Sequence, residues 1–203
     1  MNDLQLVQYA LQGDLDAFNR LVLAYQDMAY NLAYRILSDA DAAEDATQTA
    51  FLSAYRNLHH FRGGSFRAWL LRVVTNACYD ELRRQQRHPV TALEPVHEED
   101  DDEIESPSWL ADSSPSPEQQ IETRELERAI QNCLDELPLD FRTVVIMVDI
   151  QGLDYQEASL AIGKPLGTVK SRLARARLRL RDCLEHLAEL LPANLRLGLR
   201  EWR

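Results

Sequence analysis

Apolar residues recur at the three- and four-residue spacing of amphipathic helices along most of the chain, and no segment shows the alternation of a strand. The fold class that this pattern predicts is all-α. In the first part of the chain it predicts four helices: a short one carrying Leu4, Val7 and Leu11 that stops at Gly13, a longer one over 18–36, a third from near Asp39 or Asp41 to Leu58, and a fourth from about Ser65 to Arg87.

From His88 the sequence changes to Pro, Ser, Asp and Glu, which is typical of a flexible linker. A new helix start follows, with Ser116 as N-cap, Pro117 at the first helical position and Gln119 completing a capping box. Helices are then expected over about 117–137, 140–150, 154–162 and 166–191. We therefore predict two small helical domains joined by a flexible acidic linker, with bounds 1–88, 89–116 and 117–191, and a tail over 192–203 to which the pattern assigns no role.

The three cysteines, Cys78, Cys133 and Cys183, stand alone on predicted helices, without a CxxC pair for zinc and with an odd count that fits no disulfide framework. We interpret them as small buried apolar residues. No run approaches the length of a membrane span, and the first residues lack the basic, apolar start of a secretion signal. We therefore expect a cytoplasmic protein with no metal site and no cofactor.

The net charge of −11 is unevenly distributed. Residues 94–125 hold twelve acidic side chains and one basic one, Arg124, so this segment carries the whole excess. Two basic segments flank it: residues 56–93 contain seven arginines, and residues 164–181 contain seven Lys and Arg and no acid. A single basic stretch is usually a solvated helix face, but two such segments favour a nucleic-acid partner.

Residues 154–180 have the layout of a helix-turn-helix: a short helix, a turn with Gly163, and a longer basic helix. If Val169, Leu173 and Ala176 face the core, the second helix presents several side chains outward near its N-terminal end, where base edges are read. Residues further along are better placed for phosphates. The outward residues are Lys170, Ser171, Arg172, Ala174 and Arg175, and the phosphate candidates are Arg177, Arg179 and Arg181. A basic helix packed in an ordinary bundle is the alternative.

In the fourth helix, Phe66, Leu70, Val73, Ala77 and Leu82 form the expected core face. A different face carries Trp69, Arg72, Asn76 and Arg83, close to a glycine-containing loop with Phe61 and Arg62. Aromatic and basic side chains together can stack unpaired bases and hold a phosphate backbone. An ordinary core role for Trp69 is equally compatible with the sequence.

Three segments resemble the extracytoplasmic-function (ECF) group of RNA polymerase sigma factors. Residues 41–51 (DAAEDATQTAF) resemble the segment of that family that binds core polymerase. Residues 61–70 (FRGGSFRAWL), continued through Asn76 to Arg84, resemble the segment that melts the promoter and reads the minus-ten element. Residues 165–177 (PLGTVKSRLARAR) resemble the helix that reads the minus-thirty-five element.

The resemblance implies a sigma factor that directs core RNA polymerase to promoters, binds duplex and single-stranded promoter DNA, and is held by an anti-sigma partner. It assigns core binding to Asp41, Glu44, Asp45, Gln48 and Phe51. Single-strand and minus-ten contacts fall to His60, Phe61, Arg62, Trp69, Arg72, Asn76 and Arg83. The minus-thirty-five duplex falls to Lys170, Ser171, Arg172, Arg175, Arg177 and Arg179.

Two other classes of function would account for parts of the sequence. A helix-turn-helix regulator that acts without polymerase would use only the second domain and leave the Trp69 and Asp41–Gln48 faces unexplained. An enzyme would need a metal site at Asp100–Asp102 or acid-base groups at His59 and His60, but neither has the spacing or neighbours that such chemistry requires. We therefore expect no enzymatic activity and no catalytic residue.

Overall fold

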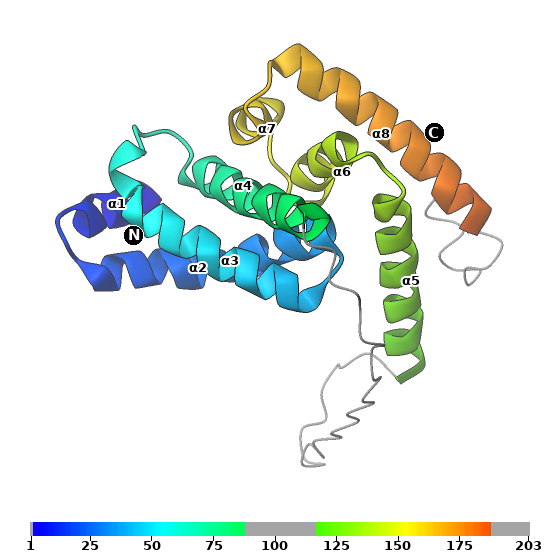
Figure 1. Cartoon of the computed structure of the whole chain (residues 1–203), viewed down its shortest axis with the longest axis horizontal. Helices are drawn as coiled ribbons and strands as arrows, with labels where there is room; N and C mark the ends of the chain where they lie inside the picture. The colour runs from blue at the N-terminus through cyan, green and yellow to red at the C-terminus, as the bar shows by residue number, and fades with distance from the viewer. Residues whose placement is uncertain (1, 88–116, 188–203) are drawn as a thin grey trace.

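The computed structural model describes residues 2–87 and 117–187, and all regular elements within these ranges are helices (Figure 1). The all-α prediction is therefore confirmed for this part of the chain. The predicted linker with its Ser116 cap and the predicted tail lie outside it. The helices are α1 (Asp3–Leu11), α2 (Leu15–Leu37), α3 (Ala40–Arg56), a 3-10 turn (Leu58–His60), α4 (Phe66–Arg87), α5 (Pro117–Asp135), α6 (Leu139–Val145), a π-helical turn (Ile146–Ile150), α7 (Tyr155–Ile162) and α8 (Leu166–Leu187).

Short polar residues define the boundaries of the first helices. The Asp14 carboxylate accepts a hydrogen bond from the Ala17 amide at 3.1 Å and so caps α2. Asp39 caps α3 in the same way, accepting from the Ala42 amide at 2.7 Å. Between these helices, Ser38 is the C-cap of α2 and adopts a left-handed backbone conformation with φ of 59°. The third helix thus begins where the sequence predicted.

The buried faces of α1 and α4 differ from the predicted stripes. In α1, which packs on α2, the buried residues are Leu6, Val7 and Ala10, whereas Leu4 and Leu11 are 40% and 48% exposed. A helix of nine residues with apolar side chains on two sides does not reveal which side is covered. In α4, Leu71, Val74 and Cys78 are fully buried, and the predicted Val73, Ala77 and Leu82 are only half-buried, because α4 is covered by α2, α3 and α7.

Two caps mark the ends of α7, the first helix of the helix-turn-helix in the second domain. Asp154 accepts from the amides of Gln156 and Glu157, each at 2.8 Å, while the Glu157 carboxylate accepts from the Asp154 amide at 3.2 Å. Together these bonds form a capping box. Gly163 then ends α7 with φ of 68°, a conformation that glycine adopts without strain. The core-facing stripe of α8 is confirmed at Val169, Leu173 and Ala176; Leu180 and Leu184 are half-buried.

The two domains pack against each other, and their cores are continuous. In Figure 1, α7 lies against α4, and α5 and α6 lie beside the C-terminal end of α2. Polar contacts cross the junction: the Ser65 hydroxyl donates to Glu157 at 2.7 Å, and Arg142 donates to the Ile36 carbonyl at 3.0 Å. The sequence predicted two domains but gave no indication of this contact between them.

The prediction that all three cysteines stand alone is wrong for two of them. Cys133 on α5 and Cys183 on α8 form a disulfide, with their Cα atoms 5.8 Å apart. They are 50 residues apart in the sequence, and only the packing of α5 on α8 brings them together. Cys78 is a free and buried thiol, as predicted.

Candidate nucleic-acid interface

The N-terminal part of α8 presents an exposed basic surface. Because Val169 and Leu173 are buried on the opposite side, Lys170, Ser171 and Arg175 are all exposed. The Lys170 ammonium lies 5.7 Å from the centre of the Tyr155 ring on α7, which links it to the first helix of the motif. Among the described side chains, neither Lys170 nor Arg175 forms an ion pair, so their charge is available to a polyanion.

The prediction that Arg172 points outward is wrong. Its guanidinium turns back toward α6 and forms an ion pair with Asp140 at 2.6 Å. The side chain is only 21% exposed. Arg172 therefore fastens α8 to α6, because position 172 lies at the border between the buried and exposed faces and an acid from another helix is within reach.

The later arginines of α8 are also engaged with the protein. Arg177 pairs with Asp149 at 2.5 Å, and this hydrogen bond raises the pKa of the Arg177 guanidinium above its usual value. Arg179 lies over the Phe141 ring at 5.3 Å, and Arg181 pairs with the exposed Asp182 at 3.0 Å. These arginines remain at the surface, but their orientation is set by partners on α6, the π-helical turn and α8 itself.

A second basic surface lies on α4. Arg72, Asn76 and Arg83 are exposed on one side of this helix. Arg83 pairs with Asp80 one turn earlier, and the Arg72 guanidinium lies 3.7 Å from the point where a side chain at Gly163 would begin. The turn of the helix-turn-helix therefore lies directly beside the predicted single-strand surface.

Trp69 is neither fully exposed nor fully buried. Its ring packs 5.6 Å from the rings of both Phe61 and Phe66, so these three side chains form an aromatic cluster at the edge of the core. His60 and Arg62 in the adjoining loop are exposed. The loop thus carries the predicted aromatic and basic groups together, with Phe61 and Trp69 presenting only part of their surface.

An acidic face lies on α3, on the side away from its buried alanines. Asp41, Glu44, Asp45 and Gln48 are exposed, and Gln48 donates to Glu44 at 3.3 Å. Phe51 is half-buried against the core. Leu52 was missed in the sequence: it is 58% exposed and lies one turn beyond Gln48 on this face. Its position off the apolar stripe was the signal that could have revealed it.

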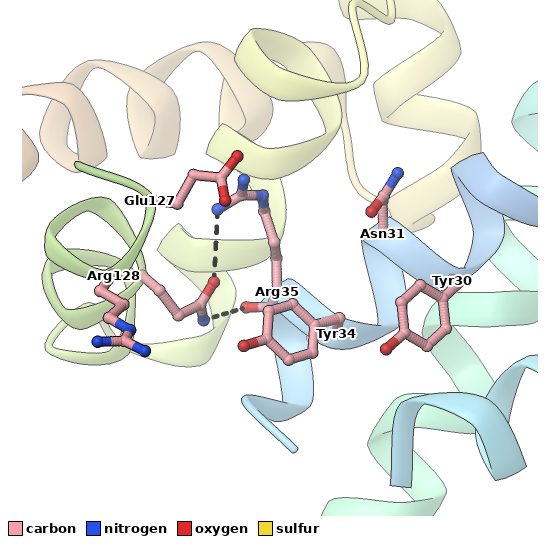
Figure 2. A pocket seen from close by; sticks show the side chains of 7 residues that line it. Tyr30, Asn31, Tyr34, Arg35, Glu127 and Arg128 are labelled. Carbon is pink, nitrogen blue, oxygen red and sulfur yellow. Dashed lines mark hydrogen bonds between the residues drawn. The ribbon is translucent and has the colours of Figure 1, made fainter. Parts of the chain in front are cut away.

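The junction between the domains also contains a pocket of about 350 Å³ between α2 and α5. Figure 2 shows the side chains that line it, with Gln131 bridging the helices by a bond from Arg35 at 3.5 Å and a bond to the Arg35 carbonyl at 3.4 Å. The pocket is separate from both basic surfaces. It is lined by Tyr30, Asn31, Tyr34, Arg35, Glu127, Arg128 and Gln131.

Neither a metal-binding cluster nor a membrane-spanning helix is found in the described ranges. Within residues 2–87 and 117–187, no cluster of His, Cys, Asp and Glu side chains is suited to holding a metal ion. The helices in those same ranges are too short or too polar to cross a bilayer.

Comparison with known proteins finds matches over both domains. Residues 21–88 match the model of sigma-70 region 2, and residues 127–180 match that of sigma-70 region 4. The chain is 37% identical to the RNA polymerase sigma-H factor of Pseudomonas aeruginosa over 91% of its own length and 95% of that protein. It is 34% identical to the ECF sigma-E factor of Haemophilus influenzae, over 92% of this chain and 97% of that protein.

A further relative, the ECF sigma factor SigE of Mycolicibacterium smegmatis, is 37% identical, and the match spans 88% of this chain and 66% of that protein. Among solved structures, CnrH in complex with the cytosolic domain of CnrY has the same fold, with a TM-score of 0.67, 23% identity, and 91% and 97% of the two chains covered. The sigma factor RpoE bound to the anti-sigma factor NepR, from Bartonella quintana, gives a TM-score of 0.61 at 25% identity. The match covers 83% of this chain and 96% of that one.

These matches include both domains and the order in which they occur. They set aside the regulator that works without polymerase, since region 2 is present as well as region 4. They set aside the enzyme too, because members of this family initiate transcription without catalysing a reaction themselves. The chain belongs to the ECF family of RNA polymerase sigma factors, which bring core RNA polymerase to promoters.

Proposed function

We propose that this sigma factor divides its work among three surfaces: the acidic face of α3, the α4 surface with its preceding loop, and the N-terminal part of α8. The observation that carries this proposal is the separation of charge. Two exposed basic surfaces lie on α4 and α8, and an exposed acidic face lies on α3. The basic surfaces suit promoter DNA, and the acidic face suits a basic protein surface.

Core polymerase would bind the face formed by Asp41, Glu44, Asp45 and Gln48. Its four side chains are exposed on consecutive turns of one rigid helix, so a basic partner helix could meet all of them. Leu52 at the end of this face adds an apolar contact, which is the composition expected where a polar rim meets a buried centre. Half-buried Phe51 would support the face from below.

The melted minus-ten strand would follow α4. Arg72, Asn76 and Arg83 offer donors for the backbone of a single strand, and the loop with His60, Phe61 and Arg62 would receive an unstacked base. Because the Trp69 ring is partly covered, an unpaired base could stack only on the exposed part of the ring. Unstacking costs only a few kcal/mol, so capture of bases can favour opening without any bond being broken.

The duplex minus-thirty-five element would be read by Lys170, Ser171 and Arg175. They are exposed near the helix end that enters the major groove, and Lys and Arg can bond to guanine O6 and N7. Arg177 and Arg179 would bind phosphates, held in orientation by Asp149 and Phe141. Arg172 would act indirectly, by fastening α8 to α6 through Asp140.

The protein would work in the cytoplasm, where polymerase and promoters are found, and an anti-sigma partner would hold it inactive. The second inference is supported by a structural relative that is a sigma factor in complex with an anti-sigma factor. An anti-sigma partner that binds both domains at once would cover the DNA surfaces of α4 and α8. These surfaces are near each other, because α7 and the Gly163 turn lie close to α4.

The experiment that tests this function is run-off transcription on fragmented genomic DNA by purified core polymerase, with and without the protein. We expect discrete new start sites that share two upstream elements. If the protein binds duplex DNA but gives no new start sites, the proposed division of labour is wrong.

A further inference from the structure

The disulfide between Cys133 and Cys183 lies at the end of the DNA-reading domain that is remote from its base-reading surface. Cys183 belongs to the last turns of α8, whereas Lys170 and Ser171 lie near its start. Cys133 lies in the last turn of α5. The bond therefore joins the C-terminal end of α5 to that of α8, the second helix of the helix-turn-helix.

Non-covalent packing of α8 weakens toward this end. Val169, Leu173 and Ala176 are buried, but no residue from 177 to 186 is. Leu180 and Leu184 are half-buried, and Leu178 is 50% exposed. The second half of the helix thus depends on partial apolar contacts, on polar contacts such as Arg177 with Asp149, and on the disulfide.

The two sulfurs differ in access from solution. Cys133 is fully buried, whereas Cys183 is half-buried. Both line a surface hollow of about 590 Å³, together with Asn132, Glu136, Leu137, Arg179, Asp182 and His186. A small oxidant or thiol can therefore reach Cys183, while Cys78, buried in the core of the first domain, has no comparable access.

We propose that Cys133 and Cys183 are a reversible thiol–disulfide site that controls the order of the C-terminal half of α8. This rests on the proposed cytoplasmic location, where a disulfide is rarely a permanent structural bond and is more often formed and broken in response to the redox state. The site lies away from the proposed polymerase-binding face and from the base-reading residues Lys170, Ser171 and Arg175, and it adjoins the DNA surface only at Arg179.

Oxidation would be supplied by a peroxide. The Cys183 thiolate attacks one peroxide oxygen, the O–O bond breaks, and a sulfenic acid and one water form after protonation. The Cys133 thiol then attacks the sulfenic sulfur, its proton leaves with the hydroxyl group as a second water, and the S–S bond is made. Two thiols lose two electrons and two protons, and hydrogen peroxide is reduced to two waters. A dithiol reverses the bond by exchange and is itself oxidised to a disulfide.

Closing a loop of 50 residues restricts the unfolded and partly opened chain, so the oxidised form should hold α8 on α5 more firmly. Reduction leaves Leu180 and Leu184 as the main apolar anchors of this half. The residues whose order changes include Arg179, a proposed phosphate contact, whereas Lys170 and Ser171 stay fixed by the packing of Val169 and Leu173.

The first test counts thiols in the full chain. The protein is equilibrated in glutathione buffers of graded redox ratio, alkylated after denaturation, and weighed by mass spectrometry. We expect one alkylated cysteine in the oxidised form and three in the reduced form, with Cys183→Ser forming no intramolecular disulfide at any ratio. Three free thiols even after peroxide treatment would overturn the proposal, and so would a disulfide that the folded protein keeps in excess dithiothreitol.

The second test measures hydrogen exchange of the α8 amides in both forms. Amides 180–187 should exchange about tenfold or more faster after reduction, while those of α1 stay unchanged. The double variant Cys133→Ser/Cys183→Ser should match the reduced protein in every buffer, and Cys78→Ala should keep the response. Equal rates in the two forms would refute the control of α8. Neither test uses polymerase, so failure here is independent of failure of the proposed function.

Discussion

At the scale of single residues, the same side-chain type has different roles according to its position on a helix. Arg172 and Arg175 are three positions apart on α8, yet Arg172 pairs with Asp140 and Arg175 is exposed. The guanidinium of Arg175 is therefore free to reach a base edge, whereas that of Arg172 is used to fasten α8 to α6. The sequence identified the basic segment correctly, but the acids that neutralise part of it come from other helices.

Replacing Lys170 or Arg175 by alanine should weaken promoter-specific transcription. Each loses a donor to the duplex, which costs about 1–3 kcal/mol where the contact is to a base. Binding to core polymerase should be unchanged, because both residues are remote from α3. The exposed Lys164 in the turn before α8 offers a matched control, and Lys164→Ala should have a smaller effect on promoter choice. Unaltered promoter selectivity in both variants would contradict the assignment.

The Cys78 thiol should remain unreactive in the folded protein well into the alkaline range. Burial raises the pKa of Cys78 to about 12, whereas an unfolded thiol ionises near about 8.5. Between these values the unfolded chain loses a proton that the folded chain keeps, so stability falls as pH rises. In Cys133→Ser/Cys183→Ser, where Cys78 is the one thiol left, iodoacetamide labelling should stay slow as the pH passes the unfolded pKa. Labelling that accelerates there, as in the urea-unfolded control, would show that the thiol is accessible.

At the scale of elements, helix boundaries were well predicted because they depend on local chemistry. The capping box of α7 and the Asp39 cap of α3 require only residues within one turn. The faces of the helices were less predictable. Leu4 and Leu11 are exposed although they fit a helical stripe, since the covered face of a short helix is chosen by its neighbours.

Removing the cap of α7 should destabilise the second domain. Asp154→Ala deletes the acceptor for the amides of Gln156 and Glu157, which costs about 1 kcal/mol. Chemical denaturation should show a lower free energy of unfolding. Gln156→Ala, at the exposed neighbouring position, should have little effect. Equal stability of the Asp154→Ala variant and the wild type would mean that the cap contributes nothing measurable.

Reversing one charge on α3 should weaken association with core polymerase. In Asp45→Arg an exposed acid on the proposed binding face becomes a base and would repel a basic partner surface. Competition with another sigma factor for core polymerase measures the effect. Glu136→Arg, an exposed charge reversal in the second domain, should compete normally. Normal competition by Asp45→Arg as well would exclude this face from the interface.

At the scale of the whole molecule, the main feature is that the two domains pack directly against each other. Gln131 on α5 is buried at this junction and donates to the Ser38 hydroxyl at 3.0 Å as well as to Arg35. Ser38 also bonds to Asp135, and Arg142 reaches the Ile36 carbonyl. The end of α2 is therefore held by the second domain through a polar network around one left-handed residue.

Disrupting this network should shift the free protein toward a more open arrangement. Gln131→Ala removes the bonds to Arg35 and Ser38, and each such bond contributes about 0.5–1.5 kcal/mol. The radius of gyration from small-angle X-ray scattering should increase. The adjacent, exposed Asn132 provides the control variant Asn132→Ala. An unchanged radius in the Gln131→Ala protein would show that the apolar contacts alone hold the domains together.

The sequence by itself determined the helical class, most helix boundaries, the two basic segments and the family resemblance. These follow from residues close together in the chain: spacing, caps, turns and runs of charge. The tertiary structure decided which arginines of α8 are paired, how far Trp69 is covered, that the domains touch, and that Cys133 meets Cys183. Each of these depends on residues that are distant in sequence, whose approach is set by how helices pack and not by the local pattern.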